Sequence, residues 1–414
     1  MTSSEKLYIQ MSSSYAPSWG FGGPVRIFYD YAYFLKDHFE TIVLTGNAHH
    51  DYKKISIDDT NKLKNSNFKI IRFHTFFKSL VPRGINIVSP KLLIYAFFLI
   101  YNSKKNCVIH IWELRGILCI YAKILKIIFG KKLDIVHSGF GQLHDSESIF
   151  RKIYDPLFLK WTFSSFKILL GENKHEIQEY EKLKSNLKIK NKLQNQNLTY
   201  LLPLQVKKTK KISNINNQLK PNKAFRKKFN LPEEAVILLT LSRFNEKKGL
   251  KRIHEYAKRF AAKTNSQTCM VFAGKDEGFK EELISLKNST SSKNYQIKII
   301  ENLFSEDRFD LYMTSDVFLG FPIIYEETML ASLEALAVGT PVVVSKEASI
   351  PFLEKYNAGV QIDSPREDDC NALIKILSNY MLYRNGAKKI IIEIFEDSKV
   401  FNSLKNIIEE DCHV

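Results

Sequence analysis

The sequence has 414 residues, enough for two domains of ordinary size, and its 44% of hydrophobic residues argues against wholesale disorder. Its net charge of +17 predicts either an anionic partner or a surface of solvated lysines, and its longest apolar run, 92–101, is too short to cross a membrane. Five scattered cysteines without metal-ligand spacing argue against a disulfide framework and a zinc site. With a polar N-terminus that predicts no signal peptide, we expect a cytoplasmic protein.

Short apolar runs alternate with helical patterns through the first half of the chain. Strands are predicted over 7–10, 41–45, 69–73, 107–111, 133–137 and 167–170. Helices are predicted over 23–36, 90–102, 115–129 and 176–183. This alternation predicts βαβ units with a parallel sheet, which we assign to a first domain over 1–205.

A polar, basic stretch over 206–223 lacks hydrophobic periodicity and is predicted to be a linker. The alternation then restarts, which predicts a second α/β domain over 224–394. Its strands are predicted over 236–241, 268–273, 296–300, 317–320 and 341–344, and its helices over 249–260, 280–286, 307–313 and 329–338. A C-terminal helix over 395–414 is a candidate to cross back to the first domain. Two such domains in series predict a ligand-binding cleft between the carboxyl ends of their sheets.

Two glutamates, Glu326 and Glu334, frame the start of the predicted helix over 329–338. One lies in the loop before the helix and the other two turns into it, with free backbone N–H groups between them. Carboxylates can hold sugar hydroxyls, and the N–H groups at a helix N-terminus bind phosphate. This layout predicts a site for a sugar nucleotide.

Two cations lie on the loop that follows the strand over 236–241. Arg243 leaves the carboxyl end of the strand, and Lys248 lies just before the next helix. A guanidinium and an ammonium on one loop can clamp a diphosphate. A surface loop that happens to carry two cations is the alternative interpretation.

Taken together, these two segments resemble the retaining glycosyltransferases of family 4. The resemblance is specific in 242–249, which reads Ser-Arg-x4-Lys-Gly, and in 326–341, where Glu-x7-Glu precedes Ala-Leu-Ala-x-Gly-Thr-Pro; Val-Val-Val follows this segment. Looser matches lie at 15–25, 202–206, 225–232 and 271–278, so the resemblance covers nearly the whole chain. It implies an α/β protein of GT-B fold, with two Rossmann-like, doubly wound domains and an interdomain cleft. The N-terminal domain would bind the acceptor and the C-terminal domain the nucleotide sugar.

The sequence also departs from the family pattern. The family usually has Gly-Phe-Gly after the first glutamate, where this chain has Glu327, Thr328 and Met329. Its His-x-His pattern is met by His110 followed by Trp112, so the second histidine is replaced. Bulkier residues keep the backbone farther from a donor sugar, which leaves the identity of that sugar open.

The resemblance implies a retaining, metal-independent hexosyltransferase that needs no cofactor and uses a UDP- or GDP-linked sugar. Arg243 and Lys248 would stabilise the departing diphosphate, and Glu326 would orient the donor sugar. The implied donor-binding residues are Gly22, Gly23, Thr328, Met329, Leu330 and Glu334, with Glu334 on the ribose hydroxyls. His110 and His137 are candidates for contact with the sugar or the acceptor, and a structural role is the alternative for each.

The acceptor would be a glycan or lipid-linked molecule in the biosynthesis of a surface polysaccharide or glycoconjugate. A basic, apolar helix within 115–132 fits either an anionic membrane surface at the inner face or a sheet-covering helix with a basic edge. No organised stripe of basic and stacking aromatic residues predicts binding of nucleic acid. Two alternatives stay open: a sugar-nucleotide epimerase or glycogen-synthase-like polymerase on the same scaffold, and a catalytically degenerate glycan-binding protein.

Overall fold

Two units make up the protein, seen here in a computed structural model. The structure describes residues 6–18, 23–48, 55, 68–76, 87–140, 143, 152, 154–189, 197–206, 223–290, 292–301, 303, 307–326 and 328–412. One unit comprises Met1–Leu202 with Val400–Val414, and the other comprises Pro203–Lys399. These limits lie within a few residues of the expected boundaries at 205 and 395. Most of the expected linker, 207–222, lies outside the described residues.

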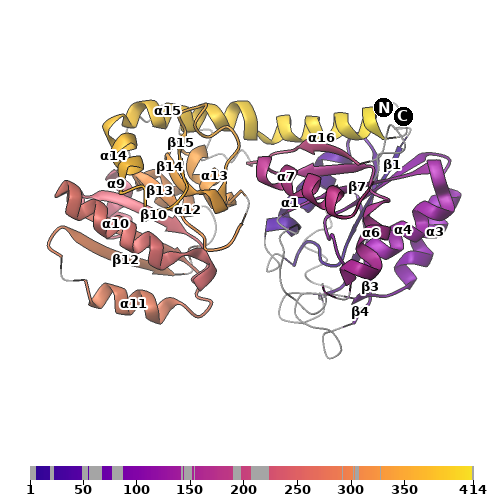
Figure 1. Ribbon diagram of the computed structural model, residues 1–414, viewed down its shortest axis with the longest axis horizontal. Helices are drawn as coiled ribbons and strands as arrows, with labels where there is room; N and C mark the ends of the chain where they lie inside the picture. Colours follow the sequence, from indigo (N-terminus) through magenta and orange to yellow (C-terminus); the bar gives the residue numbers. More distant parts are fainter. Residues whose placement is uncertain are drawn as a thin grey trace. The chain divides into compact units, whose positions relative to one another are not determined.

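A seven-stranded sheet in the order β3-β2-β1-β6-β7-β8-β9 forms the centre of the first unit (Figure 1). All its neighbouring strands are parallel, as predicted. The strands are β1 (Lys6–Ser12), β2 (Glu40–Gly46), β3 (Lys69–Phe73), β6 (Asn106–Ile111), β7 (Leu133–Ser138), β8 (Ile168–Gly171) and β9 (Leu198–Leu201). A small antiparallel pair joins β4 (Thr75–Phe76) to β5 (Ile87–Val88). The sequence did not predict β9, a four-residue edge strand too short to show a hydrophobic period.

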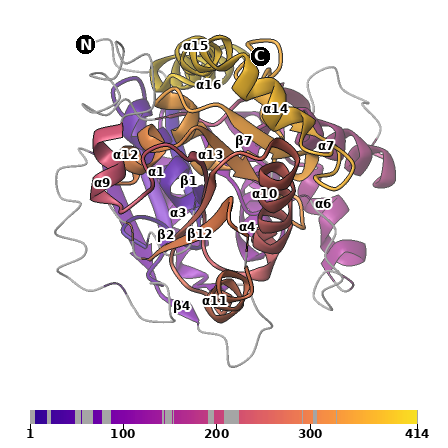
Figure 2. The ribbon, with the colours of Figure 1, turned by 90° about the vertical axis from the view of Figure 1, so that its left-hand side faces the viewer.

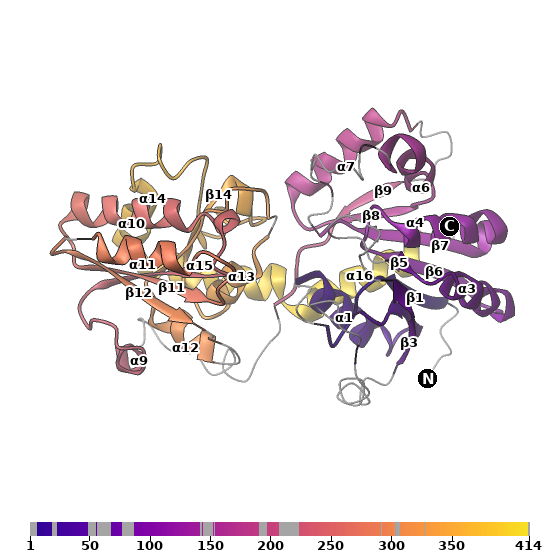
Figure 3. The same ribbon diagram turned by 90° about the horizontal axis from the view of Figure 1, so that it is seen from below.

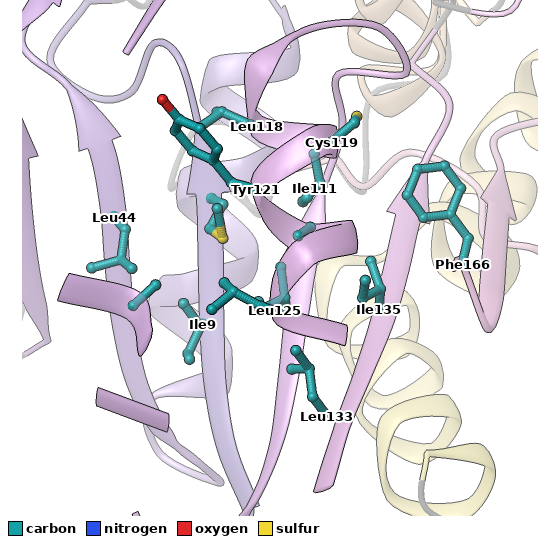
Figure 4. Packing of buried hydrophobic residues seen from close by; sticks show 14 of the residues in the cluster. Ile9, Leu44, Ile111, Leu118, Cys119, Tyr121, Leu125, Leu133, Ile135 and Phe166 are labelled. Carbon is teal, nitrogen blue, oxygen red and sulfur yellow. The ribbon is translucent and has the colours of Figure 1, made fainter. Parts of the chain in front are cut away.

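Helices cover both faces of this sheet, because the side chains of each strand alternate between two apolar layers. The helical elements are α1 (Gly23–Leu35), α3 (Lys91–Asn102), α4 (Ile117–Phe129), η4 (Gly130–Lys132), η5 (Asp155–Leu159), α6 (Lys160–Phe163), α7 (Lys174–Asn186) and α16 (Asp397–Asp411). On one face, α3 and α4 bury their apolar stripes against Leu7, Ile9 and their neighbours. Figure 4 shows Leu118, Tyr121 and Leu125 of α4 lying over strand residues that include Ile9.

The opposite face of the first sheet is covered by α1 and by the end of the chain. Phe401 of α16 stacks on Phe34 of α1, with ring centroids 4.9 Å apart, and also meets Tyr31 edge to face. The ammonium of Lys6 donates to the carbonyl oxygens of Ile408, Glu409 and Cys412, a favourable position for a cation at a helix C-terminus. The last residues of the chain therefore belong to the first unit.

A six-stranded parallel sheet in the order β12-β11-β10-β13-β14-β15 forms the centre of the second unit. Its strands are β10 (Val236–Leu241), β11 (Thr268–Gly274), β12 (Tyr295–Glu301), β13 (Val317–Gly320), β14 (Val342–Ser345) and β15 (Gly359–Ile362). The helical elements are α9 (Lys223–Lys228), η6 (Glu246–Lys248), α10 (Leu250–Thr264), α11 (Lys280–Asn288), α12 (Asp307–Thr314), α13 (Leu330–Ala337), η7 (Lys346–Ala348), α14 (Asn371–Ser378), α15 (Tyr380–Ile390) and η8 (Ile391–Phe395). Figures 2 and 3 show α10 and α14 on one side of the sheet and α9 and α12 on the other. Both units thus have the predicted doubly wound, Rossmann-like architecture.

Candidate active site

The loop after β10 is fixed to the segments on either side of it. The backbone N–H of Phe244 donates to the carbonyl oxygen of Lys275, and the N–H of Ile323 donates to that of Lys247. Gly249 ends the loop with a positive φ of 64°, and a Cβ at this position would collide with the carbonyl oxygen of Phe321. Only glycine permits both this backbone conformation and the close approach. The loop over 242–249 is therefore held directly against the segment that leads from β13 to α13.

The docking of this loop brings Lys248 to Glu326. Lys248 Nζ lies 2.5 Å from Glu326 Oε2, and the two side chains are only 15% and 16% exposed. The backbone N–H of Glu326 donates to the carbonyl oxygen of Glu347, which fixes the loop that carries the carboxylate. Lys248 and Glu326, one from each motif, therefore form a partly buried ion pair in the second unit.

Arg243, from the same loop, is more exposed and has a different partner. Its guanidinium Nη1 lies 3.1 Å from both carboxylate oxygens of Glu277, and its side chain is 59% exposed. The side-chain amide of Asn245 donates to the same carboxylate. Glu277 therefore holds the loop from its outer side, a role that sequence reasoning did not assign.

Glu334 lies on α13 and faces α12. Arg308 forms two hydrogen bonds of 3.0 Å with its carboxylate, and the hydroxyl of Tyr312 donates to it at 3.2 Å. Burial, with the nearby carboxylate, raises the pKa of Tyr312 well above its usual range, so its hydroxyl is a neutral donor. Sequence reasoning missed both residues, and the one available signal was their spacing of one helical turn on the predicted helix over 307–313.

The side chains of the residues just before α13 do not cap the N-terminus of this helix. The Thr328 hydroxyl donates to the carbonyl oxygen of Ser349, so it is directed away from the helix N-terminus. Met329 is the N-cap residue and its side chain forms no cap hydrogen bond, so Leu330 opens the helix without a side-chain partner for its N–H. Backbone N–H groups at a helix N-terminus can donate to an anion, and their role in binding the donor stays a prediction.

His110 and His137 lie in the first unit and are fully buried. The two ring nitrogens of His110 lie 2.6 Å from the Tyr8 hydroxyl and 2.8 Å from the Ser138 hydroxyl. Both ring nitrogens of His110 therefore have partners inside the first unit, which fits its alternative structural role, and its contact with a sugar or acceptor stays a prediction. His137 Nδ1 pairs with the Tyr180 hydroxyl at 2.6 Å, and its ring stacks on Phe166. Burial lowers the pKa of both histidines to about 3, so both are neutral.

The remaining predicted residues lie at the start of α1 in the first unit. Gly23 is the first residue of that helix, and Gly22 lies outside the described residues. Arg243, Lys248, Glu326, Thr328, Met329, Leu330 and Glu334 all belong to the second unit. Within the ranges that the structure describes, no three His, Cys, Asp or Glu side chains are grouped to hold a metal ion.

The fold of this chain is that of known glycosyltransferases. A glycosyltransferase from Rickettsia africae ESF-5 is 15% identical, with 99% of each chain covered and a TM-score of 0.67. Anabaena Alr3699/HepE in complex with UDP and glucose is 14% identical, with 97% of this chain and 99% of that chain covered and a TM-score of 0.66. WaaG, a glycosyltransferase involved in lipopolysaccharide biosynthesis, is 16% identical, with 97% of this chain and 100% of that chain covered and a TM-score of 0.63. These structures confirm the predicted GT-B fold class.

The sequence of the second unit matches a known family. Residues 221–391 match the family described as glycosyl transferases group 1, and this segment contains Arg243, Lys248, Glu326 and Glu334. The match confirms a resemblance to glycosyl transferases group 1 for this segment. No curated protein sequence matches the chain. Among the described helices, none is long and apolar enough to span a bilayer.

Proposed function

We propose that this protein is a retaining glycosyltransferase. It moves a hexose from a UDP- or GDP-linked donor to a glycan or lipid-linked acceptor in the biosynthesis of a surface polysaccharide or glycoconjugate. One observation carries the proposal: Lys248 of the loop after β10 and Glu326 before α13 form an ion pair. The group 1 family match over 221–391 and the UDP present in the similar Anabaena structure support it.

In this proposal the two cations act on the diphosphate. Negative charge grows on the diphosphate as its bond to the sugar breaks, and Lys248 and Arg243 compensate for it. The N–H groups at the start of α13 and the dipole of that helix add to this stabilisation. Two fixed cations supply the compensating charge, so the proposal requires no divalent metal ion.

The two glutamates bind hydroxyl groups. Glu326 accepts from a hydroxyl of the donor sugar, and Glu334 accepts from the ribose hydroxyls. Each Glu334 oxygen already accepts at least one hydrogen bond from Arg308 or Tyr312. A carboxylate has about four lone-pair sites, so it can accept these bonds and those of a ribose together.

The chemical step needs no protein nucleophile. The acceptor hydroxyl oxygen attacks the anomeric carbon from the face that the diphosphate leaves. A new carbon–oxygen bond forms while the bond to the diphosphate breaks, and the acceptor proton passes to a phosphate oxygen of the leaving group. The anomeric configuration is retained because attack and departure use the same face.

A second candidate function is that of a binding protein with the same fold that does not catalyse sugar transfer. Thr328 is 4% exposed and Met329 is 9% exposed, and they stand where the predicted family carries the Phe and the second Gly of its Gly-Phe-Gly segment. The added bulk of Met329 in place of glycine favours a protein that binds glycan or nucleotide without transferring a sugar. An epimerase on the same scaffold is a third candidate, and it would release an isomerised sugar nucleotide.

Two linked measurements separate these candidates. Thermal shift against UDP, GDP, ADP and their sugars identifies the nucleotide, because a ligand at 100 times its Kd stabilises the folded protein by about 2.7 kcal/mol. Proton NMR of the protein with that nucleotide sugar then follows the donor. Hydrolysis or transfer with a retained anomeric coupling supports a transferase, and an isomerised donor supports an epimerase. Stabilisation by a nucleotide with an unchanged donor, at every acceptor tried, would support the binding protein.

A further inference from the structure

A cavity of about 390 Å³ lies at the carboxyl ends of β14 and β15 in the second unit. Its walls come from three places: helix α10, the turn η7 that follows β14, and the segment 363–366 that follows β15. Ligand-binding cavities usually measure about 300–1,000 Å³, so this one can hold a small molecule. None of the residues assigned to the candidate active site lines it. We call it the α10–β15 cavity.

Charged side chains make up most of the lining of this cavity. Its four cations are Arg252, Arg259, Lys346 and Arg366. Its three acids are Glu255, Glu347 and Asp363. None of these seven side chains forms an ion pair with another residue that the structure describes. Both signs of charge are therefore available to a ligand in the cavity.

Two of these side chains contain a buried polar atom that lacks a hydrogen-bond partner among the described residues. These atoms are Nε of Arg259 and Oε2 of Glu347. The guanidinium of Arg259 is nevertheless fixed, because its Nη2 donates to the carbonyl oxygen of Pro365 at 2.6 Å. A partly buried carboxylate without a donor is costly, and most such groups in folded proteins have a partner. A hydroxyl group of a ligand could donate to the Glu347 carboxylate and offset this cost.

The mixed lining favours a ligand that has both an anionic and a hydroxylated part. Guanidinium groups bind phosphate as planar forks, and carboxylates accept hydrogen bonds from hydroxyl groups. A free inorganic anion would gain the arginines but would also be repelled by three carboxylates. A neutral sugar would leave the four cations without a partner. A phosphorylated monosaccharide uses both kinds of group.

Two residues of the lining also hold the segment that carries Glu326. Arg252 Nη1 donates to the carbonyl oxygen of Pro322 at 3.4 Å, and the carbonyl oxygen of Glu347 accepts the N–H of Glu326 at 2.8 Å. These two contacts lie at the two ends of the segment 322–326. A ligand that orders Arg252 and Glu347 would therefore also order the segment that brings Glu326 to Lys248.

We propose that the α10–β15 cavity is a regulatory site for a phosphorylated monosaccharide. The phosphate binds Arg252 and Arg366, and the sugar hydroxyls bind Glu347. Because this ligand meets part of the cost of ordering 322–326, nucleotide then binds more tightly to the second unit. The presence of the site does not depend on the proposed function, and only its coupling to nucleotide binding rests on that function.

Calorimetry of the full chain with glucose 6-phosphate tests the site. We expect saturable binding at least about tenfold tighter than that of glucose or of inorganic phosphate. Arg252→Gln/Arg366→Gln should bind glucose 6-phosphate at least about tenfold more weakly, because it loses charge-assisted hydrogen bonds to the phosphate. Glu347→Gln should weaken the binding of glucose 6-phosphate by about fivefold without weakening that of inorganic phosphate.

Two controls separate the cavity from other sites. Lys258→Gln removes an exposed cation of α10 that does not line the cavity, and it should leave the affinity unchanged. Arg243→Ala/Lys248→Ala should also still bind glucose 6-phosphate, because these two cations lie outside the cavity. Circular dichroism checks that each variant is folded. The site is overturned if the wild-type protein shows no saturable binding, or if inorganic phosphate binds as tightly as glucose 6-phosphate. It is also overturned if the cavity variants bind as well as the controls.

A second titration tests the coupling. Saturating glucose 6-phosphate should tighten the binding of UDP by about fivefold in the wild-type protein and should have no effect in Arg252→Gln/Arg366→Gln. An unchanged affinity for UDP in the wild-type protein would overturn the regulatory role. A protein that binds glucose 6-phosphate but no nucleotide would overturn the proposed function together with the coupling. Loss of glucose 6-phosphate binding alone would overturn the site, so the two failures are distinguishable.

Discussion

Lys248 and Glu326 are 78 residues apart in the chain, and their side chains form a partly buried ion pair. The pair connects the end of β10 with the start of α13, so it links the two segments on which the proposed function rests. In the free protein Glu326 neutralises the ammonium that the diphosphate would contact. Under the proposed function, donor binding would replace one anionic partner of Lys248 with another and release Glu326 to a sugar hydroxyl.

A double-mutant cycle measures this ion pair. Lys248→Ala and Glu326→Ala should each lower the free energy of unfolding, and the double variant should lose less than the sum. We expect a coupling of about 1 kcal/mol, at the upper end for exposed pairs because both side chains are mostly buried. Urea unfolding gives the three values. Additive losses would mean that the pair contributes nothing to the stability of the second unit.

The two cations should matter for transfer far more than for folding. Arg243→Ala/Lys248→Ala should keep the fold and lose most sugar transfer, because removal of one such donor typically lowers turnover by about 10²–10³. Lys251→Ala, a cation on α10 beyond the loop, is the matched control and should keep normal turnover. Near-normal transfer by the double variant would discredit the diphosphate clamp.

Arg308 should support nucleotide binding through Glu334. Arg308→Ala removes two 3.0 Å hydrogen bonds from the carboxylate, so Glu334 loses its fixed orientation. We expect about tenfold weaker UDP binding by calorimetry. Arg308→Lys keeps the positive charge but lacks the planar guanidinium, so its affinity for UDP should lie between those of the wild-type protein and Arg308→Ala. If Glu334→Ala abolished binding while Arg308→Ala left it unchanged, Arg308 would have no part in positioning the carboxylate.

Gly249 should not tolerate a side chain. Its φ is 64°, and an added Cβ would meet the carbonyl oxygen of Phe321. Gly278 is the matched control, because its φ is 95° but no atom lies within 4 Å of an added Cβ. Gly249→Ala should therefore cost at least about 2 kcal/mol more stability than Gly278→Ala and also lower transfer. Equal losses of stability in chemical denaturation would show that the positive φ alone, and not the collision with Phe321, sets the cost of an alanine at both positions.

Acid should destabilise the first unit through its buried histidines. Burial lowers the pKa of His110 and His137 to about 3, so the unfolded form binds more protons between about pH 3 and 6.5. Stability is then lost as the pH falls through this window, by about 1.4 kcal/mol per pH unit for each histidine. Burial also raises the pKa of Glu113 to about 7. Between about pH 4.5 and 7 the folded form therefore binds more protons at Glu113, and the protein gains about 1.4 kcal/mol of stability per pH unit as the pH falls, which offsets the loss from one histidine.

Three variants separate these contributions. Between pH 4.5 and 6.5 the wild-type protein should lose about 1.4 kcal/mol per pH unit, because two histidines oppose one glutamate. Glu113→Gln should steepen this dependence, and His110→Gln/His137→Gln should reverse it. Tryptophan fluorescence follows the first unit alone, since Trp19, Trp112 and Trp161 all lie in it. A wild-type stability that stays flat over this range would contradict the buried neutral state of the rings.

Hydrophobic periodicity was enough to predict the two parallel sheets. Strands buried on both faces read as apolar runs, so β10 over Val236–Leu241 and β13 over Val317–Gly320 were predicted with their exact limits. The edge strands β9 and β15 were missed, since four residues at a sheet edge carry little pattern. The end of α10 was placed four residues early, because Lys263 and Thr264 add no apolar period.

The candidate site was predictable where chemistry is local and not where it depends on distant partners. Arg243, Lys248 and Glu326 stand beside strand and helix ends, and Glu334 lies within a predicted helix, all of which the sequence reveals. The partners Glu277, Arg308 and Tyr312 come from other elements, and no local pattern assigns them. The burial of His110 depends on distant partners in the same way, because its position at a strand end suggests an exposed ring, but α1 covers it with Phe28 and Tyr31.

The return of α16 to the first unit sets an order for biosynthesis. Residues 400–414 are synthesised only after the second unit, and until then the aromatic surface of α1 around Phe34 lacks its cover. Translation of the roughly 200 intervening residues takes about 10–40 s at 5–20 residues per second. The unit whose synthesis begins first therefore completes its packing only after the second unit has been made.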